Sequence, residues 1–463
     1  MWYSPRDLDT KPSSARGRGR SPSLAALLSF LWPGLGQLYA GKRRAAALFA
    51  VPAALALLVL AYELRQGLVV FAARFADPAF SRDAAAIVVL LGAWRLAAVV
   101  HAFGGIEQLK IPHNFDRLVV VALVAVVAIS HAGAGYLLAV TSDAISPIFN
   151  PASSFVDLAP PNPGSSASSG PTTSPLPTPV AGGRVTILFT GTSSGESSNL
   201  YDTIMVVSYD PKTDSVQMVS VPRDSASFPF YFGGVDSAST KINSIPQYVR
   251  NGWIKSPDSP YMTLVKEVSY LVGIPINYYA VMELGGFVKM IDMVGGIDVN
   301  NPKVISDPTY DWLDGSPYGF YLSVGPHHLD GRHALAYVRS RHTIGDYDWG
   351  RASRQQEVLV DLLHKMSQPS QLLNLPKLIS TLGSSVTTNF PANQVADYVA
   401  MAQNVPSQNF KQVVLGPPYT ILNISTVNAA TCLLNDKVAA LSVQFFGQDS
   451  LWYGRPAPRN TCP

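Results

Sequence analysis

The sequence predicts an α/β domain, built on a central mixed β-sheet flanked by helices and preceded by an N-terminal multi-span α-helical membrane region. Three observations predict this: long apolar stretches fill residues 23–141, a Pro- and Ser-rich segment covers 142–183, and β-branched runs alternate with helical periodicities over 184–463. Of the 463 residues, 47% are hydrophobic and only 14% are charged, which argues against a wholly soluble single domain.

The amino-terminal part combines a polar tail with apolar stretches. Residues 1–22 are rich in Ser, Pro and Arg, which predicts a disordered basic cytoplasmic tail. Crossing a bilayer takes about 20 apolar residues in a helix. Two stretches meet that length, one is marginal, and the first is broken at Pro33-Gly34, so we expect it to be a short re-entrant or interfacial hairpin. The stretches lie at 24–40, 45–62, 84–103 and 118–140.

Positive charge predicts the direction of the chain through the membrane. Eight Lys and Arg residues lie within residues 1–44, so the positive-inside rule keeps that end in the cytoplasm. Three full spans then place residues 184–463 outside the membrane as an extracytoplasmic domain, whereas four would place them inside; we favour three. Residues 142–183 are expected to form a semi-extended spacer between the two parts.

The region 184–463 mixes strand and helix patterns, which predicts helices on both faces of one sheet. Short β-branched runs predict strands at 185–189, 203–209, 216–221, 278–282 and 411–415. Helical periodicity predicts helices at 261–272, 284–294, 331–338, 351–366, 370–382 and 392–403.

Two of the predicted strands read as a hairpin that gathers charge at one sheet edge. The segment Asp210-Pro-Lys-Thr contains residues that favour a turn, and it lies between strands 203–209 and 216–221. Antiparallel pairing brings the start of one strand beside the end of its partner. Asp202 should therefore share an edge with Arg223 and Asp224, which makes that edge a candidate site.

A set of arginines predicts the ligand of this site. Arg339 and Arg341 end one predicted helix, and Arg351 opens the next with Gln355 one turn later on the same face. Together with Arg223 they offer four guanidinium groups, which grip phosphate oxygens in bidentate fashion. The compact ligand for such a set is a diphosphate.

Other residues with chemical potential have simpler interpretations. Arg332, Arg354 and Lys365 are expected to be solvated helix residues, and Arg223 taken alone is an ordinary ion-pair partner. Adjacent His327 and His328 should diverge rather than share a metal. The aromatic run 228–232 is expected in the core more than in a lipid channel. The basic excess lies mostly before residue 45, so no nucleic-acid partner is expected.

Seven motifs occur in order over about 170 residues, and together they resemble the LytR-CpsA-Psr (LCP) family of bacterial cell-envelope proteins. The motifs are DTIMVVS from Asp202, VPRD from Val221, KIN from Lys241, GGFVKMIDMVGGIDV from Gly285, GPHHLDG from Gly325, ALAYVRSR from Ala334 and GRASRQQ from Gly350. The resemblance covers roughly residues 185–366 and implies an α-β-α fold. The family's usual anchor is a single span, whereas several are expected here.

The resemblance implies a membrane-anchored phosphotransferase that acts outside the cell membrane. Such enzymes take a glycopolymer from a polyprenyl diphosphate and attach it, as a phosphodiester, to a peptidoglycan hydroxyl, with magnesium bound against the diphosphate. Asp202 is then the metal ligand, and either Asp224 or Asp348 orients the acceptor hydroxyl. The diphosphate-binding and catalytic arginines are Arg223, Arg339, Arg341 and Arg351, assisted by Lys241 and Gln355.

Two departures from the family pattern keep alternatives open. Ser193 stands where the family usually has an aspartate that binds magnesium, and Leu200 stands where it usually has an arginine. Glu196 could replace the lost carboxylate, or the metal could keep an extra water. Hydrolysis of the polyprenyl diphosphate, and a non-catalytic module that binds lipid-linked glycans or regulates wall assembly, are the alternatives to transfer.

The cysteine content limits metal and redox chemistry. Cys432 and Cys462 are the two cysteines of the chain, and no C-x-x-C pair occurs, so zinc modules and thioredoxin-like activity are excluded. An extracytoplasmic domain lies in oxidising surroundings, where these two thiols are expected to form a disulfide.

Overall fold

The protein is described by a computed structural model over residues 21–104, 114–149, 175–192, 200–233, 240–343, 346–366, 368, 370–371, 383, 385–423 and 430–462. The chain divides into two compact units, residues 1–65 with 82–140 and residues 66–81 with 141–463. The expected tail, most of the spacer 142–183 and most of the predicted helix 370–382 lie outside the described residues.

The first unit is helical. Three of its described helices are long and apolar enough to cross a membrane, as the sequence predicts. They are α3 (Arg43–Leu64), α5 (Pro78–Gly104) and α6 (Asn114–Ile145), and they follow the short helices α1 (Pro22–Leu31) and α2 (Leu35–Tyr39). The apolar stretch 24–40 therefore forms a pair of short helices that turn at Pro33-Gly34, which confirms the predicted hairpin; its re-entrant or interfacial position stays a prediction.

Polar contacts hold this hairpin against α5. Ser29 donates to the amide oxygen of Gln37 at 2.8 Å, and the Gln37 amide nitrogen donates to the carbonyl of Ala98 at 2.8 Å. The guanidinium of Arg95 donates to the carbonyl of Phe30 at 2.6 Å. Polar groups in an apolar setting are costly unless they are hydrogen-bonded, so these contacts fix the position of the hairpin on α5.

The second unit is built on a mixed sheet, as predicted; it has six strands, of which β10 was not predicted. The strand order is β10-β5-β1-β2-β3-β11. The pairs β1–β2, β2–β3 and β10–β5 are antiparallel, and β1–β5 and β3–β11 are parallel. The strands are β1 (Val185–Thr192), β2 (Tyr201–Asp210), β3 (Ser215–Ser220), β5 (Tyr278–Glu283), β10 (Val386–Thr388) and β11 (Phe410–Val414).

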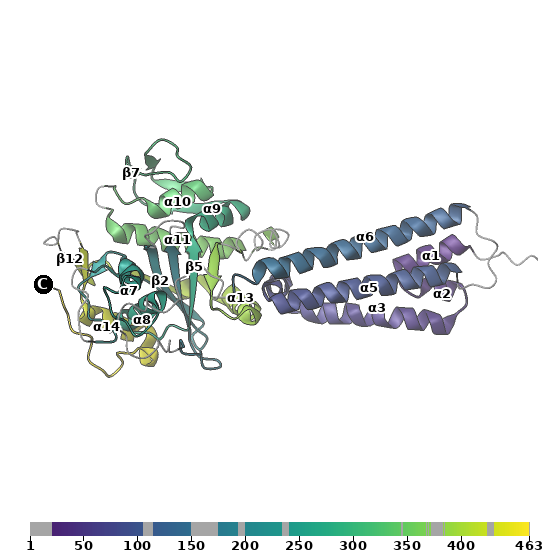
Figure 1. Cartoon of the computed structure of the whole chain (residues 1–463), viewed down its shortest axis with the longest axis horizontal. Coiled ribbons are helices and arrows are strands. Elements are labelled where there is room, and N and C mark those ends of the chain that lie inside the picture. The colour runs from purple at the N-terminus through teal and green to yellow at the C-terminus, as the bar shows by residue number, and fades with distance from the viewer. Residues whose placement is uncertain are drawn as a thin grey trace, which may run out of the picture. The chain divides into compact units, whose positions relative to one another are not determined.

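Helices cover both faces of this sheet (Figure 1). One face packs on α7 (Ile245–Arg250), α8 (Pro260–Val272) and α14 (Asn435–Phe446), and the other on α11 (Tyr347–Met366), with α9 (Leu284–Met293) and α10 (Gly331–Arg339) beyond it. The predicted helix 351–366 is correct in kind but begins four residues earlier, at Tyr347. Also present are α13 (Val395–Asn404), packed on α4 (Leu68–Ala73), and the short helices η1 (Arg74–Ala76), η3 (Ile242–Ser244), η5 (Ala392–Gln394), η6 (Ser407–Asn409) and η7 (Gly447–Asp449).

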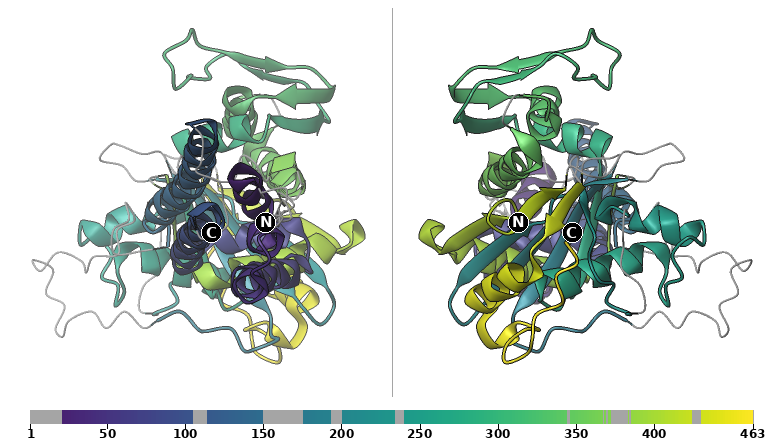
Figure 2. Two further views of the ribbon diagram at one scale, coloured as in Figure 1. Left: turned by 90° about the vertical axis from the view of Figure 1, so that its right-hand side faces the viewer. Right: turned by 90° about the vertical axis from the view of Figure 1, so that its left-hand side faces the viewer.

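Smaller sheets surround the main one, and the sequence patterns did not predict them. Two antiparallel pairs stand beyond α9 and α10 as an arm (Figure 2). They are β6 (Ile297–Asn301) with β9 (Gly325–Leu329), and β7 (Ile305–Asp307) with β8 (Phe320–Leu322). A third sheet joins β12 (Thr420–Asn423), β13 (Ala430–Leu433) and β4 (Ser225–Ala226). Strands of two to five residues carry too little periodicity to be recognised from sequence.

The main core lies between the sheet and α8. Phe228 and Phe230 are 0% and 3% exposed within it, which confirms the core interpretation of the aromatic run. Cys432 and Cys462 form a disulfide with a Cα–Cα distance of 5.6 Å, as predicted. The bond ties the C-terminal segment to the sheet that contains β4, directly after Arg223 and Asp224.

Candidate functional site

The predicted charged edge lies where β2 begins and β3 ends. Met205 of β2 pairs with Ser220 of β3, so the residues before Met205 and those after Ser220 reach the same edge. Asp202 and Arg223 form an ion pair there through one carboxylate oxygen and Nη1. The hairpin therefore brings together the two residues that its register predicted.

Asp224 and Lys241 extend this edge. The Lys241 ammonium lies 2.9 Å from the Asp224 carboxylate, and Nε of Arg223 lies 3.7 Å from its other oxygen. Lys241 directly precedes η3, and the Arg223 carbonyl accepts the N–H of Asn243 at 3.3 Å. The turn after β3 and the start of η3 thus hold each other in place.

Helix α11 contributes the other half of the site from its first turn. Asp348 accepts the backbone N–H of Arg223 at 3.1 Å, and its second oxygen lies 2.6 Å from Nη2 of Arg351. Arg351 also donates to the carbonyl of Asp202 at 3.2 Å. These bonds join α11 to the sheet edge, although Arg223 and Asp348 are 125 residues apart in the sequence.

These six residues form one connected group of three cations and three carboxylates, which we call the charged group. Their side chains are only 4–25% exposed, so their positions are fixed by pairing. Nε of Arg223 and Nε of Arg351 are buried without a hydrogen-bond partner among the described residues. The members are Asp202, Arg223, Asp224, Lys241, Asp348 and Arg351.

Burial and neighbouring charges shift the pKa of two titratable groups here, Asp348 and Arg341. Burial raises the pKa of Asp348, and Asp224 raises it further, while Arg351 opposes the shift. Desolvation and the positive charge of Arg351 lower the pKa of Arg341, which lies beside the charged group. A carboxylate with a raised pKa next to clustered cations is typical of a site that handles protons and anions.

The turn between α10 and α11 is built on a buried ion pair, and here the sequence interpretation is wrong. Arg354 was expected to be solvated but is 5% exposed. Its Nη1 lies 2.6 Å from the fully buried Asp346, its Nε donates to the carbonyl of Tyr337 at 2.6 Å, and Nη2 donates to Ser340. Arg354 therefore fixes the end of α10 relative to Asp348 and Arg351.

Asp307 is a second positioning residue that sequence analysis missed. Its carboxylate accepts the Ser340 hydroxyl at 3.0 Å and the backbone N–H groups of Arg341 and His342 at 3.2 and 3.3 Å. These bonds lower its pKa against the opposing effect of burial. Asp307 lies in β7, one of the short strands without a clear sequence pattern, so nothing marked it as a support of Arg341.

Arg339 and Gln355 contact residues outside the charged group, and their predicted role in diphosphate binding stays a prediction. The guanidinium carbon of Arg339 lies 6.0 Å from the ring centroid of Tyr310, and Gln355 donates its amide to the carbonyl of Val338 at 3.1 Å. Among the described contacts, neither side chain is bonded to the charged group. His327 and His328 diverge, as expected, because His327 bonds to Ser323 and His328 to Asp298.

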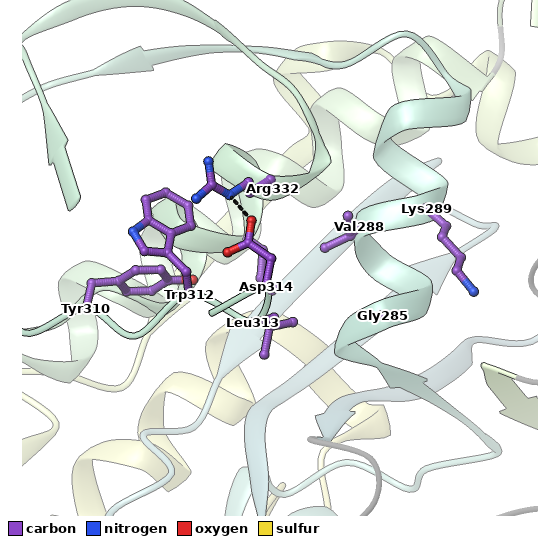
Figure 3. Close-up of a pocket in the computed structure, with 9 residues that line it drawn as sticks. Gly285, Val288, Lys289, Tyr310, Trp312, Leu313, Asp314 and Arg332 are labelled. Carbon is purple, nitrogen blue, oxygen red and sulfur yellow. Dashed lines mark ion pairs between the residues drawn. The ribbon is translucent and has the colours of Figure 1, made fainter. Parts of the chain in front are cut away.

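A cavity of about 340 Å³ is lined by residues of α9, of α10 and of the segment 310–314, including Tyr310 (Figure 3). Its interior is mostly apolar. At its mouth Arg332 lies 3.9 Å from the ring centroid of Trp312 and 2.9 Å from the Asp314 carboxylate. Arg332 is thus held by an aromatic ring and a carboxylate, rather than simply solvated.

The donor set suits a hard cation that shares its coordination with phosphate. Asp202 and Asp224 place carboxylates at one edge, and the described residues contain no group of three His, Cys, Asp or Glu side chains that could hold a metal. Magnesium is commonly bound by one or two carboxylates, with substrate phosphates and water completing the shell. Ser193 and Glu196 lie outside the described residues.

The fold and the charged group together define a class of protein, an α/β domain with a fixed group of paired arginine, lysine and aspartate side chains at one sheet edge. The comparison with known families is more specific. The LytR_cpsA_psr family matches residues 166–442, and the chain belongs to that family.

Relatives with known names share part of the chain. A polyisoprenyl-teichoic acid–peptidoglycan teichoic acid transferase TagU from Bacillus mycoides is 31% identical over 214 residues, which cover 46% of this chain and 62% of the relative. TagV from Bacillus subtilis is 32% identical over 188 residues, or 41% of this chain and 44% of the relative. The matches thus span less than two thirds of these relatives.

Among solved structures, that of B. subtilis TagV is similar at 24% identity, covering 58% of this chain and 98% of that one, with a TM-score of 0.45. TagT bound to LI-WTA is similar at 22% identity, covering 57% of this chain and 89% of that one, with a TM-score of 0.43.

Proposed function

We propose that the protein transfers a glycopolymer from a polyprenyl diphosphate to a hydroxyl of peptidoglycan. The observation that carries this is the charged group, a largely buried set of paired charges in which two arginine Nε–H groups have no hydrogen-bond partner among the described residues. Family membership and the transferase names of the relatives support it. A pre-positioned set of cations supplies most of what phosphoryl transfer needs, namely orientation and charge neutralisation.

In the proposed reaction the acceptor oxygen attacks the phosphorus that carries the glycan. The bond from this phosphorus to the bridging oxygen breaks, so polyprenyl monophosphate leaves and the glycan is joined to the acceptor by a phosphodiester. Arg223, Arg341 and Arg351 bind the phosphate oxygens. Asp348 takes the proton of the hydroxyl, because its raised pKa makes it a better base than an ordinary aspartate. Asp224 is the alternative base.

We propose magnesium as the cofactor, held by Asp202 against the diphosphate. When bound, it neutralises charge that develops on the phosphate oxygens. Calorimetry with Mg²⁺ and a polyprenyl diphosphate tests this without turnover. Asp202→Asn should weaken Mg²⁺ binding, and Ser193→Asp should strengthen it because it adds one anionic ligand. Unchanged Mg²⁺ affinity in both variants would remove the metal from the proposal.

We propose that the protein is a multi-pass membrane protein with its C-terminal domain outside. The three long apolar helices and the basic residues before residue 45 support this orientation. A reporter joined after Gly183 should show that this position lies outside the cytoplasm. Cytoplasmic activity of the reporter would separate the domain from peptidoglycan and contradict the proposed function.

The decisive experiment is a transfer assay on the full chain in lipid nanodiscs. It uses a polyprenyl diphosphate-linked glycan and peptidoglycan fragments, and follows both the glycan product and the released polyprenyl phosphate. Arg351→Ala should lower turnover about 100-fold or more, as loss of one fixed donor to a developing charge does. Arg455→Ala, at an exposed C-terminal turn, is the matched control and should leave turnover unchanged.

The two alternative functions predict different products in this assay. A hydrolase releases polyprenyl phosphate but attaches no glycan to the acceptor. A non-catalytic module binds the lipid-linked glycan and forms neither product. Either result with wild-type protein would refute transfer.

A further inference from the structure

An aromatic pair flanks Asp348 at the start of α11. The rings of Tyr347 and Trp349 are stacked, with their centroids 4.6 Å apart and an interplanar angle of 30°. Asp348, between them in sequence, directs its carboxylate to the Arg223 N–H and to Arg351. Three consecutive residues therefore supply one carboxylate to the charged group and two stacked rings on either side of that carboxylate in the sequence.

The backbone at Tyr347 is what makes this arrangement possible. Residues i and i+2 of a regular helix point in different directions, but Tyr347 has a φ of 27°, in the left-handed region. A bulky aromatic residue rarely adopts this conformation. Strain of this kind persists where the surroundings enforce it, and it concentrates at functional sites.

Of the two rings, Trp349 packs against the protein and Tyr347 is exposed to solvent. Trp349 packs against the backbone of Gly416, where an added Cβ would lie 3.0 Å from both Cβ and Cγ of Trp349. Tyr347 is 51% exposed. The glycine therefore allows Trp349 to sit close to the segment after β11, and Trp349 in turn presents the Tyr347 ring to solvent.

An exposed, rigid aromatic face next to a candidate base suits a sugar ring. A pyranose has an apolar C–H face that packs on an aromatic ring, while its hydroxyls remain free at the edge. A polyprenyl chain would be better served by an enclosed apolar cavity. The exposed ring beside paired charges therefore favours a saccharide over a lipid.

We propose that Tyr347 and Trp349 form a saccharide-binding platform that holds a sugar ring of the acceptor glycan with its hydroxyl toward Asp348. This inference rests on the proposed function, because it assigns the acceptor of that reaction. The same chemistry would also fit the first sugars of the lipid-linked donor, and the experiment below distinguishes the two sources.

Binding of chitotetraose, a soluble tetramer of N-acetylglucosamine, to the full chain in detergent micelles is the first measurement. Tyr347→Ala should weaken binding about tenfold, the factor that corresponds to about 1.4 kcal/mol. Tyr347→Phe keeps the ring and should bind within about twofold of wild type. Tyr318→Ala is the control, because Tyr318 is a 72% exposed tyrosine near β8 on the arm.

The second measurement separates acceptor from donor in the transfer assay. If the platform binds the acceptor, Tyr347→Ala raises KM for the acceptor and leaves that for the lipid-linked donor unchanged. A raised KM for the donor alone would show that the platform binds the donor's sugars and would overturn the acceptor assignment. Trp349→Ala should act in the same direction, and Tyr347→Ala remains decisive if Trp349→Ala fails to fold.

The inference fails independently of the proposed function. It is overturned if wild type does not bind chitotetraose, or if Tyr347→Ala binds it as wild type does while Tyr318→Ala is also unaffected. Loss of polyprenyl binding in Tyr347→Ala with saccharide binding intact would make the surface a lipid contact and also overturn it. Saccharide binding that depends on Tyr347, without any turnover, would refute only the proposed transfer.

Discussion

Replacing the buried Glu267 by Gln should remove a loss of stability that occurs as pH rises. Glu267 lies in α8 and is 0% exposed. One carboxylate oxygen accepts the N–H of Tyr231 at 3.1 Å, and the other has no hydrogen-bond partner among the described residues. The nearby Lys266 is paired with Asp258 instead. Burial without a counter-charge raises the pKa of Glu267 from 4.5 to about 8.

The sign and size of the effect follow from linkage. Between pH 4.5 and about 8 the folded state keeps the proton on Glu267, whereas the unfolded state has lost it. Stability is therefore full below the unfolded pKa and falls as pH rises toward the folded pKa. Each pH unit in this window costs about 1.4 kcal/mol, so the difference of about 3.5 units gives a total of about 5 kcal/mol. Gln accepts the same N–H without ionising, so it removes this term.

The measurement is unfolding of the full chain in detergent micelles at several pH values between about 5 and about 8. The stability of wild type relative to Glu267→Gln should decrease with rising pH, and taking this difference cancels the other titrating groups. Glu283→Gln, at the end of β5, controls for the removal of one carboxylate. A pH dependence that is identical in wild type and Glu267→Gln would show that Glu267 titrates normally and refute the reasoning.

Three further predictions concern the framework of the site. Reduction of the Cys432–Cys462 disulfide, whose loop spans 30 residues, should cost about 3–4 kcal/mol in unfolding measurements; an unchanged unfolding midpoint would contradict this. Arg354→Ala removes the buried counter-charge of Asp346 and leaves Lys303, 2.9 Å away, as its ion-pair partner, so it should destabilise the protein by about 1–3 kcal/mol and lower donor affinity; unchanged unfolding and donor binding in the variant would contradict this. Gly331→Ala places a Cβ 2.1 Å from a backbone oxygen of α9 and should cost about 1–3 kcal/mol, measurable as a lower Tm.

Local patterns in the sequence determined the main elements of the protein. Apolar length determined the three long helices, and β-branched runs determined five of the six strands of the central sheet, all except the short β10, because both signals are contained in the segment itself. The turn at Asp210 determined the hairpin register, and the register placed Asp202 beside Arg223. The family motifs pointed to the same edge and to α11.

Only the tertiary structure decided how α10, α11 and the arm support that edge. Arg354 looks like any solvated helix residue in the sequence, since its partners Asp346 and Ser340 become neighbours only when the connection folds back. Asp307 stabilises the Arg341 turn across 34 residues. Such contacts arise from burial and from pairing between distant segments, and neither composition nor periodicity records which segments will meet. Local chemistry thus set the elements, and long-range packing selected which charges are buried and which rings are exposed beside Asp348.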